Sequence, residues 1–238
     1  MQYLYVAEKE NYEKLASWRV LYALPGSAPF PVRLVDEIFQ RCCALIWKDR
    51  DIKLYDPCIW SWYMMTVLWF LHYEKISALV WSDINDTILM VAKKNLWLLT
   101  GAWLQSRINE IQHMIEQFGK DSHRDALLDA QKLLSGITQQ QHTIPISTFV
   151  SSISDITKEV SDEAFDIILF DAPYGMLTQW SEPIDLESIC LSLWKKLTTN
   201  GVLVMVTDKK SAKIKQNSIY AKVSFLNHGK RRITFLKK

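Results

Sequence analysis

The sequence predicts an α/β protein with a mainly parallel sheet, a C-terminal antiparallel hairpin and a helical insert. Short apolar runs alternate with segments whose apolar residues recur three and four positions apart. Two of the runs, FDIILF at 165–170 and GVLVMVT at 201–207, are continuous, as expected for strands that are covered on both faces. Strands that alternate with helices favour a parallel sheet with right-handed crossovers.

The first half of the chain is expected to hold a helix followed by a strand–helix–strand–helix unit. Apolar spacing predicts an amphipathic helix over Pro31–Ile46. The next three elements are a strand, a helix and a strand, at 53–58, 63–73 and 78–83. Asp86 is expected to cap the following helix, which runs to about Leu99.

The second half begins with the predicted insert. Helical spacing over 104–134 is broken near Gly119–Ser122, which indicates two helices within an insert at about 101–136. Beyond it we expect an extended piece at 143–150, the strand at 165–170, a helix at 185–197 and the strand at 201–207. A final hairpin is expected from two strands at 220–226 and 231–236. The expected division is an N-terminal helical extension, 1–50, and a core, 51–238, that contains the insert.

Composition limits the class of protein. With 238 residues, 49% of them hydrophobic and 23% charged, the chain can bury one sizeable core. No apolar run reaches the ~20 residues of a membrane span, and Met1–Glu10 lacks the shape of a signal peptide. The four cysteines do not suggest a disulfide framework, so we expect a reduced, cytoplasmic setting. No metal is expected, and nothing demands a dimer or an obligate protein partner, so a monomer is the simplest expectation.

Positive charge is concentrated at the C-terminal end. The net charge is only +2, but Lys209–Lys238 contains ten Lys or Arg residues and no Asp or Glu. Such a block is typical of a solvated face, and less often of a contact with nucleic acid. Charge alone does not decide between these two interpretations.

Polar residues lie at the carboxyl ends of two predicted strands. Doubly wound sheets bind their ligands beyond these ends. The segment Asp56–Tyr63 lacks the glycines that normally let such a loop approach a cofactor. By itself it is better interpreted as a strand-to-helix turn with an aromatic patch. Asp83 ends the next strand, where a carboxylate can accept both ribose hydroxyls of a nucleoside or simply cap a turn.

The segment 171–175 (DAPYG) has the most specific chemical pattern in the chain. Asp171 and nearby carbonyls can accept hydrogen bonds from a planar base, and Tyr174 can stack on it, which is worth about 1–3 kcal/mol. Pro173 stiffens the loop and preorganises the acceptors. Holding a nitrogen in line with a methyl sulfonium is then mainly a matter of position. The alternative is a plain exit from a strand into a turn.

DAPYG after a buried strand resembles the D/N-P-P-Y signature of nitrogen methyltransferases. A wider set of motifs resembles the AviRa-type family of avilamycin-resistance rRNA methyltransferases. These motifs are LYALPGSAPFPVRLVDEIFQRC, DPC-x-x-S-x-Y-x-x-TVL-x-FLH, SDIN followed by NLxLL, FGKDSHRDAL and DAPYGMLTQW. The resemblance covers about residues 17–206.

The resemblance implies a Rossmann-like class I methyltransferase core, S-adenosyl-L-methionine as methyl donor and a guanine nitrogen of large-subunit rRNA as acceptor. Three matching positions would hold the target base and act in catalysis: Asp171, Pro173 and Tyr174. Matching positions would also form the cofactor site: Asp56, Pro57, Cys58, Ser61, Tyr63, Asp83 and Ile84. Candidates for RNA contact are the helical insert and three arginines: Arg33, Arg231 and Arg232.

Tryptophan stands where this family has glycine. Trp60 and Trp62 replace two loop glycines, and an indole there would fill the space of the cofactor and remove access to positive φ. The same replacement is expected at Trp18, Trp69, Trp97 and Trp103, with Trp81 as a further candidate. The 7 glycines and 10 tryptophans sum to 17, about the number that ~7% glycine would give. Our hypothesis is that UGA encodes glycine in the source and has been translated as tryptophan.

Two alternative functions stay open at this point. A catalytically silent RNA-binding module of the same fold would keep the base pocket and the basic tail while Trp60 and Trp62 block the cofactor loop. A methyltransferase for a small molecule or a protein amide would leave the tail and the insert unexplained. The residues do not distinguish guanine N1 from N2, and the segment 143–150 offers no carboxylate for adenine recognition.

Overall fold

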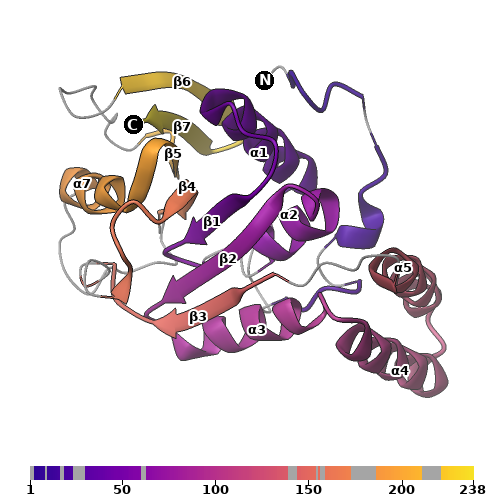
Figure 1. The fold of residues 1–238 in the computed structure, drawn as a ribbon. Helices are drawn as coiled ribbons and strands as arrows, with labels where there is room; N and C mark the ends of the chain where they lie inside the picture. Colours follow the sequence, from indigo (N-terminus) through magenta and orange to yellow (C-terminus); the bar gives the residue numbers. More distant parts are fainter. Residues whose placement is uncertain are drawn as a thin grey trace.

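The structure is a computed structural model that describes residues 3–8, 10–16, 19–23, 30–59, 63–138, 144–153, 155, 159–172, 186–210 and 221–238. A seven-stranded sheet with the order β3-β2-β1-β4-β5-β7-β6 forms its centre (Figure 1). The five parallel strands are β1 (Ile52–Asp56), β2 (Ile76–Asp83), β3 (Ile146–Val150), β4 (Phe165–Asp171) and β5 (Leu197–Asp208). The antiparallel hairpin is β6 (Ala221–His228) and β7 (Arg231–Lys237). The predicted α/β fold is therefore confirmed.

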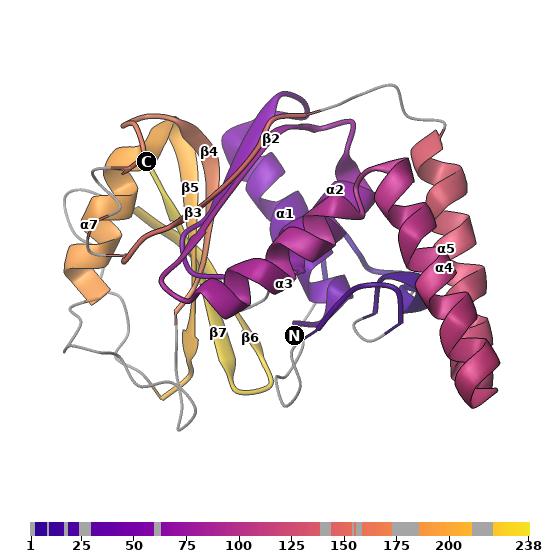
Figure 2. The same cartoon turned by 90° about the horizontal axis from the view of Figure 1, so that it is seen from below.

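Helices cover both faces of the sheet (Figure 2). One face carries α1 (Val32–Ile46), α2 (Met64–His72) and α3 (Asp86–Trp97), and the other carries α7 (Leu186–Lys196). All seven residues of β4 are buried, which explains why this strand is a continuous apolar run and not an alternating one.

The strand order reverses beside β1. The chain runs outward from β1 to β2 and β3, and then returns to place β4 on the other side of β1. Such a switch point leaves a crevice beyond the carboxyl ends of the strands, where doubly wound sheets bind ligands. The residues at the carboxyl ends of β1, β2 and β4 are therefore the candidates for a ligand site.

The predicted insert is a pair of helices, α4 (Gly101–Phe118) and α5 (Asp121–Thr138), that extends away from the sheet (Figure 1). The break lies where the sequence predicts it, because Gly119 adopts a φ of 62° and ends α4. The 3₁₀ helix η1 (Glu13–Leu15) contacts α5. Nearby, an Arg19 guanidinium nitrogen lies 2.7 Å from an Asp129 carboxylate oxygen.

The start of α3 corrects one prediction. Asn85, and not Asp86, is the N-cap, because the Asn85 side-chain oxygen accepts hydrogen bonds from the amides of Thr87 at 2.9 Å and Ile88 at 3.3 Å. Asp86 is the first helical residue, where its charge still favours the helix dipole. Both residues suit a helix start, so the sequence pattern could not separate them.

Helix α1 holds the N-terminal segment through a buried acid. The Glu37 carboxylate accepts hydrogen bonds from the backbone amides of Leu4, Tyr5 and Val6, at 2.9–3.0 Å. Helix α1 also packs within the same apolar cluster as α2 and the sheet. The division of the chain at residue 50 stays a prediction. No helix in the described part of the chain is long and apolar enough to cross a membrane.

Candidate functional site

Three buried carboxyl groups meet at the carboxyl edge of the sheet. Asp56 ends β1, Asp83 ends β2 and Asp171 ends β4, and these strands are neighbours in the order β2-β1-β4. Their residues are only 1%, 5% and 1% exposed. The structure thus brings together the three acids that the sequence singles out, directly at the switch point.

Asp56 has the most perturbed environment of the three. One of its carboxyl oxygens, Oδ1, accepts a hydrogen bond from the Cys58 amide at 3.2 Å, whereas Oδ2 is buried and has no partner among the described residues. Burial raises the pKa of Asp56 well above its usual range; the Cys58 amide opposes this, and the neighbouring Asp171 and Asp83 raise it further. A cation bound beside Asp56 would stabilise the ionised carboxylate and so lower its pKa.

Asp83 is held in a defined orientation by backbone amides. Its Oδ1 atom accepts a hydrogen bond from the Asn85 amide at 2.8 Å. Burial raises the pKa of Asp83, while hydrogen bonds from the amides of Asn85, Ile59 and Ile84 act in the opposite direction. An acceptor fixed in this way at a strand end can bind hydroxyl donors.

The loop after β1 is tied to β2. The Ser82 hydroxyl lies 2.8 Å from the Tyr55 hydroxyl and donates to the Pro57 carbonyl at 3.4 Å. Burial raises the pKa of the Cys58 thiol, and the charges of Asp83, Asp56 and Asp171 raise it further. Cys58 is therefore a poor nucleophile, because it is the thiolate that reacts.

Tyr63 anchors the far end of this loop. It is buried, and its hydroxyl donates a hydrogen bond to the Phe30 carbonyl. The Arg231 guanidinium lies 4.8 Å from the centre of the Phe30 ring, so the start of β7 is close to the same place. Tyr63 thus has a structural contact at the predicted cofactor loop.

Two exposed apolar side chains flank Asp83. Ile84 is 65% exposed and Val150 is 55% exposed, and Val150 pairs with Asp83 across β2 and β3. The sequence singles out Ile84 but misses Val150, because the expectation for 143–150 concerned a carboxylate and not an apolar contact. The sequence signal for Val150 is an aliphatic residue at the last position of the expected extended segment 143–150. Trp60, Ser61, Trp62, Pro173 and Tyr174 lie outside the described residues.

The predicted arginines occupy different surroundings. Arg231 and Arg232 begin β7, close to exposed Lys209, Lys210 and Lys230 at the end of the sheet where β5 ends. Burial lowers the pKa of the nearby His228, and the charges of Arg231 and Lys209 contribute.

Arg33 is already engaged within the molecule. Its guanidinium donates to the carbonyls of Val6 and Ala7, each at 2.7 Å, and lies 4.0 Å from the centre of the Tyr3 ring. An RNA contact at Arg33 stays a prediction, and the structure gives this side chain a role in fastening the N-terminal segment.

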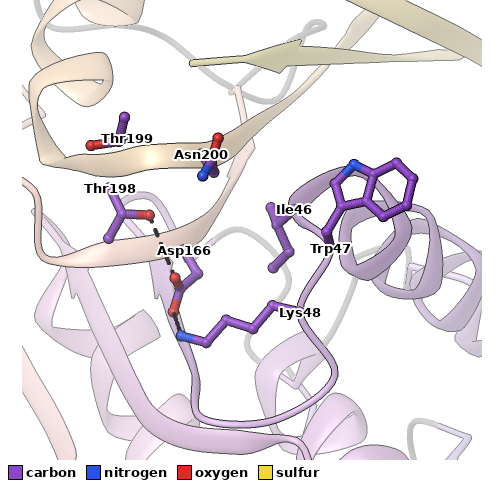
Figure 3. A pocket seen from close by; sticks show the side chains of 7 residues that line it. All are labelled: Ile46, Trp47, Lys48, Asp166, Thr198, Thr199 and Asn200. Atoms are coloured by element: carbon purple, nitrogen blue, oxygen red, sulfur yellow. Dashed lines mark hydrogen bonds and ion pairs between the residues drawn. The ribbon is translucent and has the colours of Figure 1, made fainter.

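A pocket of about 350 Å³ lies at the opposite edge of the sheet, at the amino ends of β4 and β5 (Figure 3). Its most buried polar residue, Asp166, is already bonded: one carboxyl oxygen lies 2.9 Å from the Lys48 ammonium and accepts from the Lys53 amide at 2.9 Å. The pocket lies far from the carboxyl edge in the fold and contains none of the predicted site residues. Its polar contacts are structural.

Relatives of this chain match it along most of its length. The family model described as rRNA methyltransferase AviRa matches residues 1–231. A 23S rRNA (guanine(2535)-N(1))-methyltransferase of Streptomyces viridochromogenes is 33% identical over 213 residues, which cover 87% of this chain and 85% of the relative. Two solved structures of the rRNA methyltransferase aviRa from that organism have 31% and 29% identity and TM-scores of 0.87, and each match covers 100% of this chain and 96% of the other. This chain therefore belongs to the AviRa family of rRNA methyltransferases.

Proposed function

We propose that this protein transfers a methyl group from S-adenosyl-L-methionine to N1 of a guanine in large-subunit rRNA. Family membership supports the reaction class, and the named relative supports the acceptor. The observation that carries the proposal is the group of three buried carboxyl groups, Asp56, Asp83 and Asp171, at the switch point of the sheet.

The carboxyl edge suits this cofactor. S-adenosyl-L-methionine supplies an electrophilic methyl group on a positively charged sulfur. Asp56 has a buried oxygen without a partner among the described residues, close to two further acids, which favours a bound cation. Asp83 would accept the ribose hydroxyls, and the exposed faces of Ile84 and Val150 would pack against the adenine ring. Pro57, Cys58, Ser61 and Tyr63 would shape the loop around the rest.

Asp171 is placed to act on the base. It is the last residue of β4, the strand beside β1, and it is close enough to raise the pKa of Asp56, so a guanine above it would lie beside the cofactor loop. Its carboxylate would accept the N1 proton as N1 bonds to the methyl carbon, and Pro173 and Tyr174 would fix the ring. The methyl–sulfur bond would break in the same step, with S-adenosyl-L-homocysteine as the neutral leaving group. The expected increase in reaction rate comes from positioning of the base and from proton transfer to Asp171.

The basic end of β7 would hold the RNA backbone at the rim of this site. Lys209, Lys210, Lys230 and the half-buried Arg232 offer several positive charges on one edge. Phosphate contacts of this kind give affinity without reading the base sequence. We further propose a cytoplasmic protein that acts as a monomer, and resistance to avilamycin-type drugs as the consequence of methylation.

The test is methyl transfer from labelled S-adenosyl-L-methionine to rRNA and to assembled large subunits, with the product mapped by nucleoside mass spectrometry. It is run on this chain and on a Trp60→Gly/Trp62→Gly variant, because the indoles could block the loop. We expect 1-methylguanine, and we expect Asp171→Asn to lower the rate by on the order of 10²-fold or more.

Asp49→Asn is the matched control, since Asp49 is an exposed acid before β1, at the opposite edge of the sheet, and this variant should keep the parent rate. Methylation at N2 would refute the N1 assignment only. If the parent chain and the Trp60→Gly/Trp62→Gly variant both bind RNA but neither transfers a methyl group, the proposed enzymatic activity is refuted. The catalytically silent RNA-binding module would then be the remaining function.

A further inference from the structure

The end of helix α1 places a tryptophan in a backbone conformation that favours glycine. Trp47 follows the last helical residue with φ 56° and ψ 39°, and its amide donates to the Cys43 carbonyl. Helix α4 ends with the same geometry at Gly119, where φ is 62° and the amide donates to the Ile115 carbonyl at 2.8 Å. Glycine is the usual residue here because a Cβ atom makes the left-handed region unfavourable.

No contact among the described residues compensates for this conformation of Trp47. The residue is 89% exposed, so its indole gains almost no burial. Figure 3 shows the ring turned away from the Lys48–Asp166 ion pair of the adjacent pocket. A bulky aromatic residue with positive φ is a true outlier, and within the described part of the chain neither packing nor a side-chain hydrogen bond explains it.

Two other tryptophans are buried without satisfying their polar atom. Trp69 in α2 is 3% exposed and Trp81 in β2 is 1% exposed. The indole Nε1 atom of each is buried and has no hydrogen-bond acceptor among the described residues. A buried tryptophan usually finds an acceptor, because an unsatisfied N–H loses its hydration without replacement.

A further pair is exposed at the junction of α3 and α4. Trp97 is 42% exposed and Trp103 is 48% exposed. Their rings stack on each other with centroids 4.5 Å apart and an interplanar angle of 20°. Each indole is thus partly exposed and partly covered by another tryptophan.

Trp194 shows what a well-placed tryptophan looks like in this fold. It lies in α7, is 8% exposed and belongs to the apolar cluster between that helix and the sheet. It is not among the buried side chains that have an unsatisfied polar atom. Five described tryptophans therefore differ from Trp194, each through exposure, backbone conformation or an unsatisfied N–H.

We propose that the native polypeptide carries glycine at positions 47, 69, 81, 97 and 103, because its source reads the UGA codon as glycine, and that Trp194 is a genuine tryptophan. The backbone at Trp47 adds a position that the family motifs do not reveal. The same decoding would give glycines at positions 60 and 62 and restore an open cofactor loop. Residue identity at these positions does not depend on whether the protein methylates RNA.

The decisive test reads the native chain directly. Peptides from the protein purified from its source are sequenced by mass spectrometry, and the codons of its gene are read beside them. We expect glycine with UGA at positions 47, 69, 81, 97 and 103, and tryptophan with UGG at position 194. Tryptophan in the peptide at position 47, or UGG at that codon, would overturn the proposal, and so would UGA at position 194 with tryptophan in its peptide.

A second measurement uses the recombinant tryptophan-bearing chain. Trp47→Gly should raise the melting temperature, by about 2–4 °C, because it relieves the left-handed backbone without removing buried surface. Trp194→Gly is the control and should lower it, because that side chain is buried. A fall in melting temperature for Trp47→Gly would contradict the conformational argument.

Discussion

Asp56 is the residue whose titration reports most directly on the site. Its raised pKa means that the folded protein keeps a proton over a pH range in which the unfolded chain has already lost it. The stability of the ligand-free protein should therefore fall as the pH rises from about 4, the pKa of an unfolded Asp, through the folded pKa. A cation bound beside Asp56 would favour the ionised form and act in the opposite direction.

For Asp56→Asn, we expect a flatter dependence of the free energy of unfolding on pH above about pH 4, the pKa of an unfolded Asp. The variant should also be more stable than the parent at pH values where folded Asp56 has lost its proton. Urea denaturation at several pH values measures this. Asp121→Asn, at an exposed position, should reproduce the parent slope. Equal slopes in the parent and in Asp56→Asn would show that Asp56 has an ordinary pKa.

Calorimetric titration tests whether Asp56 contacts the cofactor. If Asp56 faces the cationic cofactor, the affinity for S-adenosyl-L-methionine should rise with pH through the folded pKa of Asp56, because binding releases a proton. In Asp56→Asn the affinity should fall about tenfold or more and lose this dependence, as one close opposite charge is removed. An unchanged affinity would place the cofactor elsewhere. The titration is best made in the Trp60→Gly/Trp62→Gly background.

At the scale of elements, the start of α3 gives a clear comparison between two neighbouring residues. Asn85→Ala removes the side chain that accepts from the Thr87 and Ile88 amides, and should cost about 1 kcal/mol. Asp86→Ala removes only a favourable charge in the first turn and should cost a few tenths of a kcal/mol. Urea midpoints of the two variants measure the difference. A larger loss for Asp86→Ala would restore the sequence prediction.

Helix α1 supports the N-terminal segment through Glu37. Burial alone would raise the pKa of Glu37, but the amides of Leu4, Val6 and Tyr5 and the Arg41 side chain lower it below its usual value. This contribution to stability is present above the unfolded pKa of about 4.3 and is lost as the pH falls.

Glu37→Ala should cost at least about 1.5–3 kcal/mol, because three backbone donors and Arg41 lose a charged acceptor. It should also make residues 3–8 more susceptible to limited proteolysis. Glu13→Ala, at an exposed glutamate, is the control and should change neither property. Unchanged cleavage in Glu37→Ala would mean that other contacts hold the segment.

At the scale of the whole molecule, charge is distributed unevenly around a nearly neutral protein. Acids are buried at the carboxyl edge, while exposed lysines stand at the neighbouring end of the β6–β7 hairpin. This arrangement predicts that the rim attracts RNA and that the buried acids act on what is delivered there.

Lys230→Glu/Arg232→Glu should weaken RNA binding similarly across sequences, and it should reduce the salt dependence of log K by about one for each phosphate that the protein no longer neutralises. Filter binding at several salt concentrations measures both effects. Arg50→Glu/Lys53→Glu is the control with the same change in net charge, because both residues are exposed at the start of β1, at the opposite edge of the sheet. Equal reductions in affinity in the two variants would indicate a general effect of net charge and no defined RNA surface.

The sequence by itself determined the sheet, the insert and the three acids. Continuous apolar runs mark strands that are covered on both faces, and parallel strands bring their carboxyl ends to one edge, so Asp56, Asp83 and Asp171 could be grouped in advance. These features depend on local pattern and on a general rule of chain connection. Neither requires knowledge of a specific contact.

Only the tertiary structure decided how individual side chains are used. Arg33 looks like an exposed cation in the sequence, yet its partners are carbonyls of Val6 and Ala7, which lie more than two dozen residues away. The exposed face of Val150 depends on its pairing with Asp83, and the positive φ of Trp47 depends on how α1 ends against the sheet. Burial, partner choice and backbone strain arise from contacts between distant segments, and a linear pattern does not specify them.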